Sequence, residues 1–337
     1  MQPFVGGKDD LLSTVGRSRR KEHDVSGEGS ELHLGILLVD TPGSTFELVE
    51  LGDLGNQVEA AGFYRVGVSD HLVAAHIRTF DPIVCLSCLA AATSKVRVAV
   101  QVLVLPLRHP IQVAHAFTSL DQLSEGRIEL GVGVGGDWPI EFDSVGVDLH
   151  RRGERTDEAL AVMLSLWERQ EVTFEGKHFR LKDLKSASSP VQRPHPPIVI
   201  GGRSERALAR AAKLGNRWDG IFLDASKFAS RRMRLDELSA ETGREVSSGM
   251  VIWTCAGEPR SSRGKLATAL EGFYRLPFER FARYAVWGDV DTIKERLLEY
   301  KDAGASEITL IPVGNLSEQV ELLSALLHER ALQEARL

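Results

Sequence analysis

Cysteine is scarce in this sequence, with three residues among 337. Three thiols are too few for a disulfide framework, so a reducing compartment, the cytoplasm, is expected. No run of lysine or arginine resembles a nucleic-acid-binding stripe, and nucleic-acid partners are therefore not expected. Long hydrophobic runs are missing as well. The longest uncharged apolar stretches, 82–94 and 98–107, are too short to cross a bilayer, so no membrane association is expected.

The overall composition is that of a soluble globular chain. Apolar residues make up 43% and charged residues 26%, and 41 Lys and Arg against 47 Asp and Glu give a formal charge of −6. Residues 1–30 are rich in Gly, Ser and charged residues without sustained periodicity, so we interpret them as a disordered extension or a misassigned start of the chain. Residues 31–337 are long enough to form one large α/β domain.

Short runs rich in β-branched residues and leucine alternate with longer helical patterns from residue 32 onward. Several runs are apolar throughout, as strands buried on both faces require. The runs cover 34–39, 65–69, 96–105, 127–134, 197–200, 220–223, 249–254 and 307–311. Helical patterns between them end near glycine, a favoured C-terminal stop, and include 48–61, 110–123, 205–214 and 292–303. Strand candidates that are each followed by a helix predict a closed (β/α)₈ TIM barrel, with an open doubly wound sheet as the alternative.

One segment breaks this alternation. Residues 172–181 read as a small β-hairpin with Gly176 at its turn, inserted between the fourth and fifth barrel strands. Cys85 and Cys88 form a C-x-x-C motif, but their apolar, alanine-rich surroundings and the lack of a second ligand pair favour a core position. His115 falls on an apolar helix and is interpreted as a partnered core histidine. No metal-ligand spacing occurs, so no metal is expected.

The active site of such a barrel is formed by residues just after the C-terminal ends of the strands. Asp70 and His71 directly follow the second strand. A carboxylate beside a histidine can fix the orientation and tautomer of its ring and tune its basicity. The alternative is a capped turn at a solvated strand end, and the residues themselves leave both interpretations open.

Two glycine-rich segments also follow predicted strands. Gly131, Gly133 and Gly136 match the dinucleotide-binding pattern G-x-G-x-x-G, but no helix begins directly after them. We therefore favour a glycine-rich loop that lets a flat ligand approach the backbone. The segment 201–204, Gly-Gly-Arg-Ser, stands between a strand and a helix that Ser204 can cap. Its backbone N–H groups could cradle a phosphate, and an ordinary tight turn is the alternative.

Together these motifs resemble the luciferase-like flavin and deazaflavin oxidoreductases. The likeness runs from about residue 34 to about residue 327 and depends on the order and spacing of several segments. They are AAGFYRVGVSDHL (60–72), AAATSKVRVAVQVLVLPLRHP (90–110), LDQLSEGRIELGVGVGGDWPIEFDSVGV (120–147), RRGERTDEALAVMLSLW (151–167), VTFEGKHFRL (172–181) and PPIVIGGRSERALARAAKLGNRWDGIF (196–222).

The resemblance implies a TIM barrel with a flavin-type ring at its C-terminal mouth. Asp70 and His71 resemble the pair found in members that use the deazaflavin coenzyme F-420. His71 is then expected near the reacting ring carbon as proton donor or acceptor, with Asp70 beside it and also at the cofactor. Gln101 and Val102 match a bulge of the third strand that backs the ring, where the family has a non-proline cis peptide bond.

The resemblance extends to the rest of the cofactor. Gly135 and Gly136 match the loop along the ring and ribityl chain. Gly201 and Gly202, with Arg203 and Ser204, match the turn that holds the phosphate. The substrate pocket is expected to include two residues after the fourth strand, Trp138 and Glu141, and the aromatic segment 273–284 is a further candidate.

Two departures from the family pattern bear on the substrate. Residues 216–218, Asn-Arg-Trp, stand where the family usually has Asp-Gly-Trp, so Arg217 is expected to change the mouth of the barrel. The tryptophan that follows Asp-His in the sugar-phosphate dehydrogenase branch is absent, which disfavours a sugar phosphate.

Three functions are compatible with the sequence. The first is an oxidoreductase that transfers hydride between F-420 and a small organic substrate. The second is an FMN-dependent monooxygenase that needs reduced flavin from a partner reductase, and the third is a non-catalytic flavin-binding protein. The Asp70–His71 pair favours the first over the second. A homodimer is expected because members of the family often associate in this way.

Overall fold

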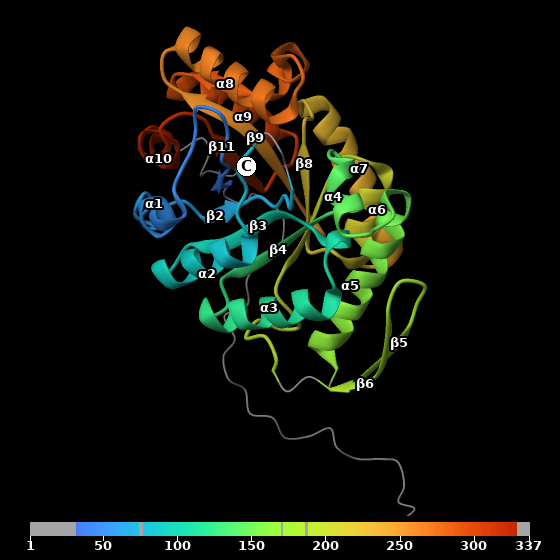
Figure 1. Ribbon diagram of the computed structural model, residues 1–337. Helices are drawn as coiled ribbons and strands as arrows, with labels where there is room; N and C mark the ends of the chain where they lie inside the picture. Colours follow the sequence, from blue (N-terminus) through green and yellow to red (C-terminus); the bar gives the residue numbers. More distant parts are fainter. Residues whose placement is uncertain (1–31, 74–76, 170, 186–187, 329–337) are drawn as a thin grey trace, which may run out of the picture.

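Parallel strands close into an eight-stranded barrel in the part of the chain that the computed structural model describes, residues 32–73, 77–169, 171–185 and 188–328 (Figure 1). The ring closes because β9 pairs with both β8 and β11, and β11 pairs with β1. The barrel strands are β1 (His33–Leu38), β2 (Arg65–Val68), β3 (Arg97–Val104), β4 (Ile128–Gly133), β7 (Ile198–Gly201), β8 (Arg217–Ile221), β9 (Ser247–Ala256) and β11 (Glu307–Pro312). The predicted extension, residues 1–30, lies outside the described residues.

Helices surround this barrel (Figure 1). Those that follow barrel strands are α1 (Leu51–Ala60), α2 (Pro82–Ala92), α3 (Pro110–Leu123), α4 (Pro139–Ser144), α5 (Arg152–Glu168), α6 (Glu205–Leu214), α7 (Ala225–Thr242), α8 (Pro259–Tyr274) and α10 (Leu316–Ser324). After α8 the chain forms a short strand, β10 (Val286–Gly288), which pairs with the end of β9, and then α9 (Val290–Asp302). The predicted TIM barrel is therefore confirmed, and the doubly wound sheet is wrong. None of the described helices combines the length and the apolar character needed to cross a membrane.

The eight predicted strand runs all correspond to barrel strands, and one of them is displaced. The sixth was predicted at 220–223 from its apolar residues, whereas β8 begins at Arg217 and ends at Ile221. The apolar run was misleading because Arg217 and Asp219, two charged residues, are buried in this strand. The predicted hairpin is confirmed as β5 (Glu171–Glu175) paired with β6 (Arg180–Lys185).

The cysteine interpretation is confirmed, and the histidine interpretation is wrong. Cys85 lies on α2 with 2% of its surface exposed. Burial raises the pKa of its thiol to about 12, which leaves it protonated and unreactive at neutral pH. Cys88 is half-buried on the same helix. His115 is exposed on α3 because it lies on the solvent-facing side of that helix.

Buried charged side chains pair with one another between the N-terminal ends of the barrel strands. Arg65 Nε lies 2.8 Å from Glu129 Oε2, and Arg217 Nη1 lies 2.8 Å from Glu307 Oε1. Arg217 Nε also lies 2.9 Å from Asp219 Oδ1. Burial alone would lower the pKa of Arg217, but the surrounding carboxylates of Asp219, Glu307 and Glu129 raise it well above its ordinary value. Arg217 therefore belongs to the floor of the barrel, and the expectation that it changes the mouth is wrong.

Candidate functional site

Asp70 follows β2 at the mouth of the barrel, and its carboxylate binds the end of β3. Oδ2 accepts a hydrogen bond from Val104 N at 2.9 Å, and Oδ1 accepts one from Arg108 Nη2 at 2.8 Å. The side chain is 2% exposed. Both oxygens are thus engaged away from His71, and the expected orientation of His71 by Asp70 is wrong. Asp70 instead fixes the end of β2 to the end of β3.

A different carboxylate faces His71. Glu141, on α4, has Oε1 3.4 Å and Oε2 3.5 Å from His71 Nδ1. Glu141 Oε1 also accepts a hydrogen bond from Leu72 N at 2.6 Å. With 1% of its side chain exposed, Glu141 lies beneath the histidine and does not line an open pocket, which corrects the predicted role. Because a carboxylate oxygen accepts hydrogen bonds, this arrangement favours a proton on Nδ1 and leaves Nε2 on the side of the ring away from Glu141.

Aromatic rings cover the other sides of His71. The ring of Trp138 lies 3.8 Å from the imidazole between centroids, so Trp138 is at the mouth, as expected. Phe273, near the end of α8, contacts both rings, with centroids 5.8 Å from His71 and 5.5 Å from Trp138. Phe273, from the candidate segment 273–284, therefore lies beside His71 and Trp138, and its expected role in a substrate pocket stays a prediction.

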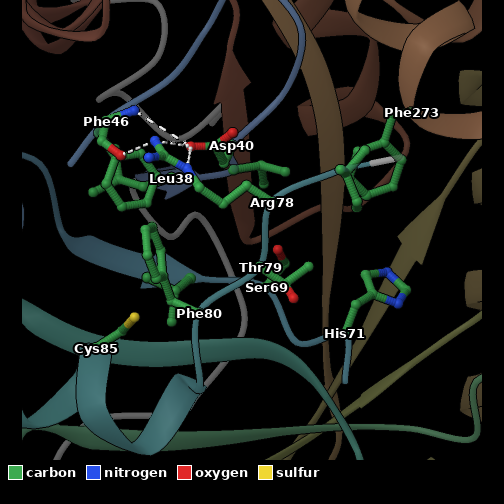
Figure 2. Close-up of a pocket in the computed structure, with 13 residues that line it drawn as sticks. Leu38, Asp40, Phe46, Ser69, His71, Arg78, Thr79, Phe80, Cys85 and Phe273 are labelled. Atoms are coloured by element: carbon green, nitrogen blue, oxygen red, sulfur yellow. Dashed lines mark hydrogen bonds and ion pairs between the residues drawn. The ribbon is translucent and has the colours of Figure 1, made fainter. Parts of the chain in front are cut away.

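Figure 2 shows His71 and Phe273 along one side of a small cavity next to the ends of β1 and β2. Its far side contains Arg78, whose guanidinium binds Asp40 Oδ2 at 2.7 Å. The cavity measures about 20 Å³. That volume holds roughly one water molecule, far less than a small organic substrate needs.

The third strand has the predicted irregularity. The Gln101–Val102 peptide bond is cis, and the pairing of β3 with β4 shifts register between Val100 and Leu103. Gln101 Nε2 donates to Asp219 Oδ2 at 2.7 Å. Gln101 Oε1 is buried and has no hydrogen-bond partner among the described residues. This oxygen can therefore accept a hydrogen bond that no described residue donates.

Glycines around this bulge make room for the side chain of Val102. A Cβ on Gly133 would overlap Val102 Cγ2, and a Cβ on Gly201 would lie 2.7 Å from Val102 Cγ1. A Cβ on Gly131 would overlap the carbonyl oxygen of Val100. Gly131 and Gly133, the first two glycines of the G-x-G-x-x-G pattern, therefore allow β4 to pack closely against β3. The interpretation that they admit a flat ligand is wrong for Gly131 and Gly133.

At Gly135 and Gly136 the backbone conformation, and not close packing, requires glycine. Gly135 and Gly136 have φ of +61° and +120°, which L residues rarely adopt. They form the turn between β4 and Trp138, so the chain passes the mouth there without side chains. Their expected contact with the cofactor stays a prediction.

The expected phosphate turn follows β7 and differs in one respect. Gly202 has φ of +127°, and its N–H donates to Asp219 O at 3.1 Å. That N–H group is therefore already engaged within the barrel, and the expected contact of Gly201 and Gly202 with a phosphate stays a prediction. Ser204 caps α6 as predicted, because its hydroxyl accepts a hydrogen bond from Ala207 N at 3.2 Å. Arg203 is exposed beside this turn.

Sequence reasoning missed one residue of the site, Asp219, and named Phe273 only as one end of the candidate segment 273–284. Asp219 holds Gln101, yet it stands in a strand whose start was placed too late. Phe273 lies on α8, far along the chain from the loops that it contacts. The only local signal for Asp219 was a charged residue directly before the apolar run 220–223, which is costly to bury unless it is paired.

Comparisons with known proteins agree with this architecture. The luciferase-like monooxygenase family, as represented by its sequence model, matches residues 32–261. The uncharacterized protein y4wF of Sinorhizobium fredii is 32% identical over 162 residues, which are 48% of this chain and 47% of that protein. An uncharacterized protein of Mycobacterium tuberculosis, Rv0953c, is 35% identical over 146 residues, 42% of this chain and 50% of that protein. The match thus spans about half the length of these relatives.

Solved structures show the same fold at low sequence identity. An F-420-dependent secondary alcohol dehydrogenase, solved with an F-420–acetone adduct, has a TM-score of 0.79 and 18% identity, covering 90% of this chain and 99% of its own. The monooxygenase RslO1 from Streptomyces bottropensis has a TM-score of 0.77 and 20% identity, covering 88% and 99%. The oxygenating constituent of 3,6-diketocamphane monooxygenase from Pseudomonas putida, in complex with FMN, has a TM-score of 0.71 and 17% identity, covering 87% and 97%.

Proposed function

The chain belongs to the luciferase-like monooxygenase family, and we propose on that premise that it is an oxidoreductase using the deazaflavin coenzyme F-420 to transfer hydride to or from a small organic substrate. The observation that carries the proposal is His71 at the barrel mouth, held between the carboxylate of Glu141 and the ring of Trp138. A histidine fixed at the end of a barrel strand can exchange a proton with a bound substrate.

The residues at the mouth fit the ring of such a coenzyme. Gln101 Oε1 is a buried acceptor without a partner among the described residues, as expected where a ligand supplies the donor. Val102 is half-buried beside it, at the bulge that the resemblance assigns to the face of the ring. Gln101, Val102 and the turn at Gly135 and Gly136 would hold the ring end of the coenzyme.

The phosphate end needs a different set of groups from the one predicted. Gly202 N is engaged by Asp219, so the first turn of α6 and the guanidinium of Arg203 would bind the phosphate instead. A helix N-terminus stabilises an anion through its free N–H groups and its dipole. Ser204 already uses its hydroxyl to cap Ala207 N, which leaves backbone groups as the main donors.

When bound, F-420 carries carbon in place of the N5 nitrogen of a flavin, and it supplies or accepts a hydride without using oxygen. His71 holds or releases the accompanying proton at Nε2, since Nδ1 faces Glu141. Glu141 keeps the imidazole in place through its second contact, to Leu72 N. Trp138 and Phe273 cover the imidazole and limit its exposure to water. Asp70 has a positioning role, because its carboxylate accepts a hydrogen bond from Val104 N and so holds the end of β3.

The test is a pair of fluorescence titrations of the purified protein, one with oxidised F-420 and one with FMN. We expect F-420 to bind more tightly than FMN, because the residue pair 70–71 resembles the F-420 branch. Micromolar FMN affinity without detectable F-420 binding would contradict the proposal and would favour the flavin-dependent monooxygenase. Binding of neither ligand would contradict both.

A further inference from the structure

The turn of the β5–β6 hairpin is attached to α5 by one carboxylate. Glu154 and Glu158 are four residues apart on α5, so their side chains lie on the same face of the helix. Glu158 Oε1 accepts a hydrogen bond from Lys177 N at 2.9 Å, and its Oε2 accepts one from His178 N at 2.8 Å. The turn is therefore held against the first two turns of α5, outside the barrel strands (Figure 1).

This attachment places the imidazole of His178 beside Glu154. The side chain of His178 is 10% exposed, and its Nε2 lies 3.4 Å from Glu154 Oε2. Nε2 is buried, and no described residue forms a hydrogen bond with it. A buried polar atom of this kind is rare unless a water molecule or an ion completes its contacts. The imidazole thus directs an unused ring nitrogen towards a carboxylate.

The three side chains are close enough to share one ion. One atom from each of Glu154, Glu158 and His178 lies within 4.8 Å of the other two. Two ligands at about 2.1 Å from a tetrahedral zinc ion are about 3.4 Å apart. The distance between His178 Nε2 and Glu154 Oε2, 3.4 Å, already has this value. A small side-chain rotation brings the third ligand into place.

Both carboxylates are ionised at neutral pH. Hydrogen bonds from Lys177 and Arg151 lower the pKa of Glu154 to about 2. Burial raises the pKa of Glu158, but the backbone N–H groups of the hairpin turn lower it further, to below its ordinary value.

The two cations that pair with Glu154 do not close the site. Lys177 Nζ lies 2.6 Å from Glu154 Oε1, and Arg151 Nη2 lies 3.0 Å from Oε2. Both are surface side chains, and ion pairs of exposed groups contribute little to stability. The carboxylate itself is 37% exposed, so an ion arriving from solvent can reach it and replace the lysine.

We propose that Glu154, Glu158 and His178 form a binding site for one divalent transition-metal ion, with zinc as the best match. Zinc accepts one imidazole nitrogen and two carboxylate oxygens, and a water molecule completes the tetrahedron. Magnesium and calcium fit less well, because both take oxygen ligands. The bound ion ties the hairpin to α5. The expectation of no metal relied on local spacing, whereas His178 comes from a different element, twenty residues beyond Glu158.

Zinc chloride titrated by calorimetry into the untagged, EDTA-treated full chain is the direct test. The native protein should bind one zinc ion per chain, and magnesium chloride should bind much more weakly. Glu154→Gln and His178→Ala should each weaken zinc binding about 100-fold, since even the loss of a group that only supports a ligand costs about 10–100-fold. Glu154 is half-buried at the surface of α5, so Glu154→Gln tests the site without disturbing the core.

Two controls match these variants. Glu171 stands at the other end of β5, and its carboxylate also pairs with a lysine, with Oε2 3.3 Å from Lys185 Nζ. Glu171→Gln is therefore the control for Glu154→Gln. His115→Ala, at an exposed position on α3, is the control for His178→Ala. Both controls should bind zinc like the native protein. No zinc binding by the native protein, or equal losses in the controls, would overturn the site.

Amide hydrogen exchange, followed by mass spectrometry, locates the ion. Zinc should slow exchange in residues 172–181 of the native protein but not in Glu154→Gln, because a bound ion stabilises the segment that it holds. Zinc binding without this protection would place the ion elsewhere and overturn the proposal. None of these measurements involves the coenzyme, so their outcome is independent of the F-420 titration.

Discussion

The packing of Val102 against glycine can be tested by adding a single carbon atom. Gly201→Ala would place a Cβ 2.7 Å from Val102 Cγ1, and the next two neighbours, at 3.6 and 3.7 Å, also belong to Val102. Ordinary carbon–carbon contact is about 3.5–4.0 Å, so the valine or its strand must shift by about 1 Å. Overpacking of this kind typically costs about 1–3 kcal/mol in the free energy of unfolding.

Val102→Ala should remove the conflict. Alone it deletes two methyl groups from a half-buried side chain, at a cost of about 1 kcal/mol. In the double variant the clashing Cγ1 atom is gone, and the new Cβ at position 201 lies 3.7 Å from the Cβ of residue 102. The double variant should therefore be about as stable as Val102→Ala, with a coupling of about 1–3 kcal/mol between the two sites.

Urea unfolding of the native protein, the two single variants and the double variant measures this coupling. Gly264→Ala on α8 is the matched control, because a Cβ there meets nothing within 4 Å. It should stabilise the protein by about 0.5–1 kcal/mol, the usual gain for alanine over glycine inside a helix. Additive costs at Gly201 and Val102, within about 0.5 kcal/mol, would refute the packing argument.

Three further predictions follow from individual side chains. His71→Ala should keep most of the F-420 affinity but lower turnover roughly 10²–10⁴-fold on a substrate found by screening, and unchanged turnover would return His71 to a structural role. Glu141→Gln keeps a group that can accept from the Leu72 N–H but removes the charge facing His71, so turnover should fall less than in His71→Ala; an equal or larger loss would contradict a positioning role. For Glu59, burial raises the pKa but the N–H groups of residues 94–96 lower it further, to about 2, so its contribution to stability is present above about pH 4.5 and is lost as the pH falls towards 2. Glu59→Gln should thus cost about 1–2 kcal/mol in urea unfolding at pH 7 and progressively less at pH 3, whereas a cost independent of pH would contradict this account.

The barrel was predictable because strands buried on both faces have a local signature. The runs 65–69 and 96–105 are short and rich in valine and leucine, so each can be recognised without its neighbours. The helices could also be recognised from local sequence, since the predicted ranges 110–123 and 205–214 agree with α3 and α6. The sixth strand was displaced because its buried charges are stabilised only by partners on other strands.

The contacts of the site were not predictable in the same way. Asp70 precedes His71 in the chain, but its carboxylate binds Val104 and Arg108, more than thirty residues further along. Which carboxylate reaches His71 depends on where α4 packs, and nothing local to Glu141 indicates that. The cis bond before Val102 came from the family resemblance, and it is confirmed.

The glycines show why a motif alone can mislead. Gly131 and Gly133 match a ligand-binding pattern, yet the atoms that exclude a Cβ there belong to the neighbouring strand β3. The sequence shows that side chains are absent at these positions, but only the pairing of β3 with β4 shows what takes their place. Gly202 is similar, because its N–H group is used by Asp219 of the adjacent strand β8.

A crystal structure of the protein grown with oxidised F-420 tests the central claim most directly. The account predicts electron density for the ring at the barrel mouth, against Val102, with His71 Nε2 directed at the ring or the space beside it. It also predicts that a donor of the ring or a bridging water approaches Gln101 Oε1, which has no partner among the described residues. A ring bound away from Val102 and His71, or a mouth that accepts FMN but never F-420, would contradict it.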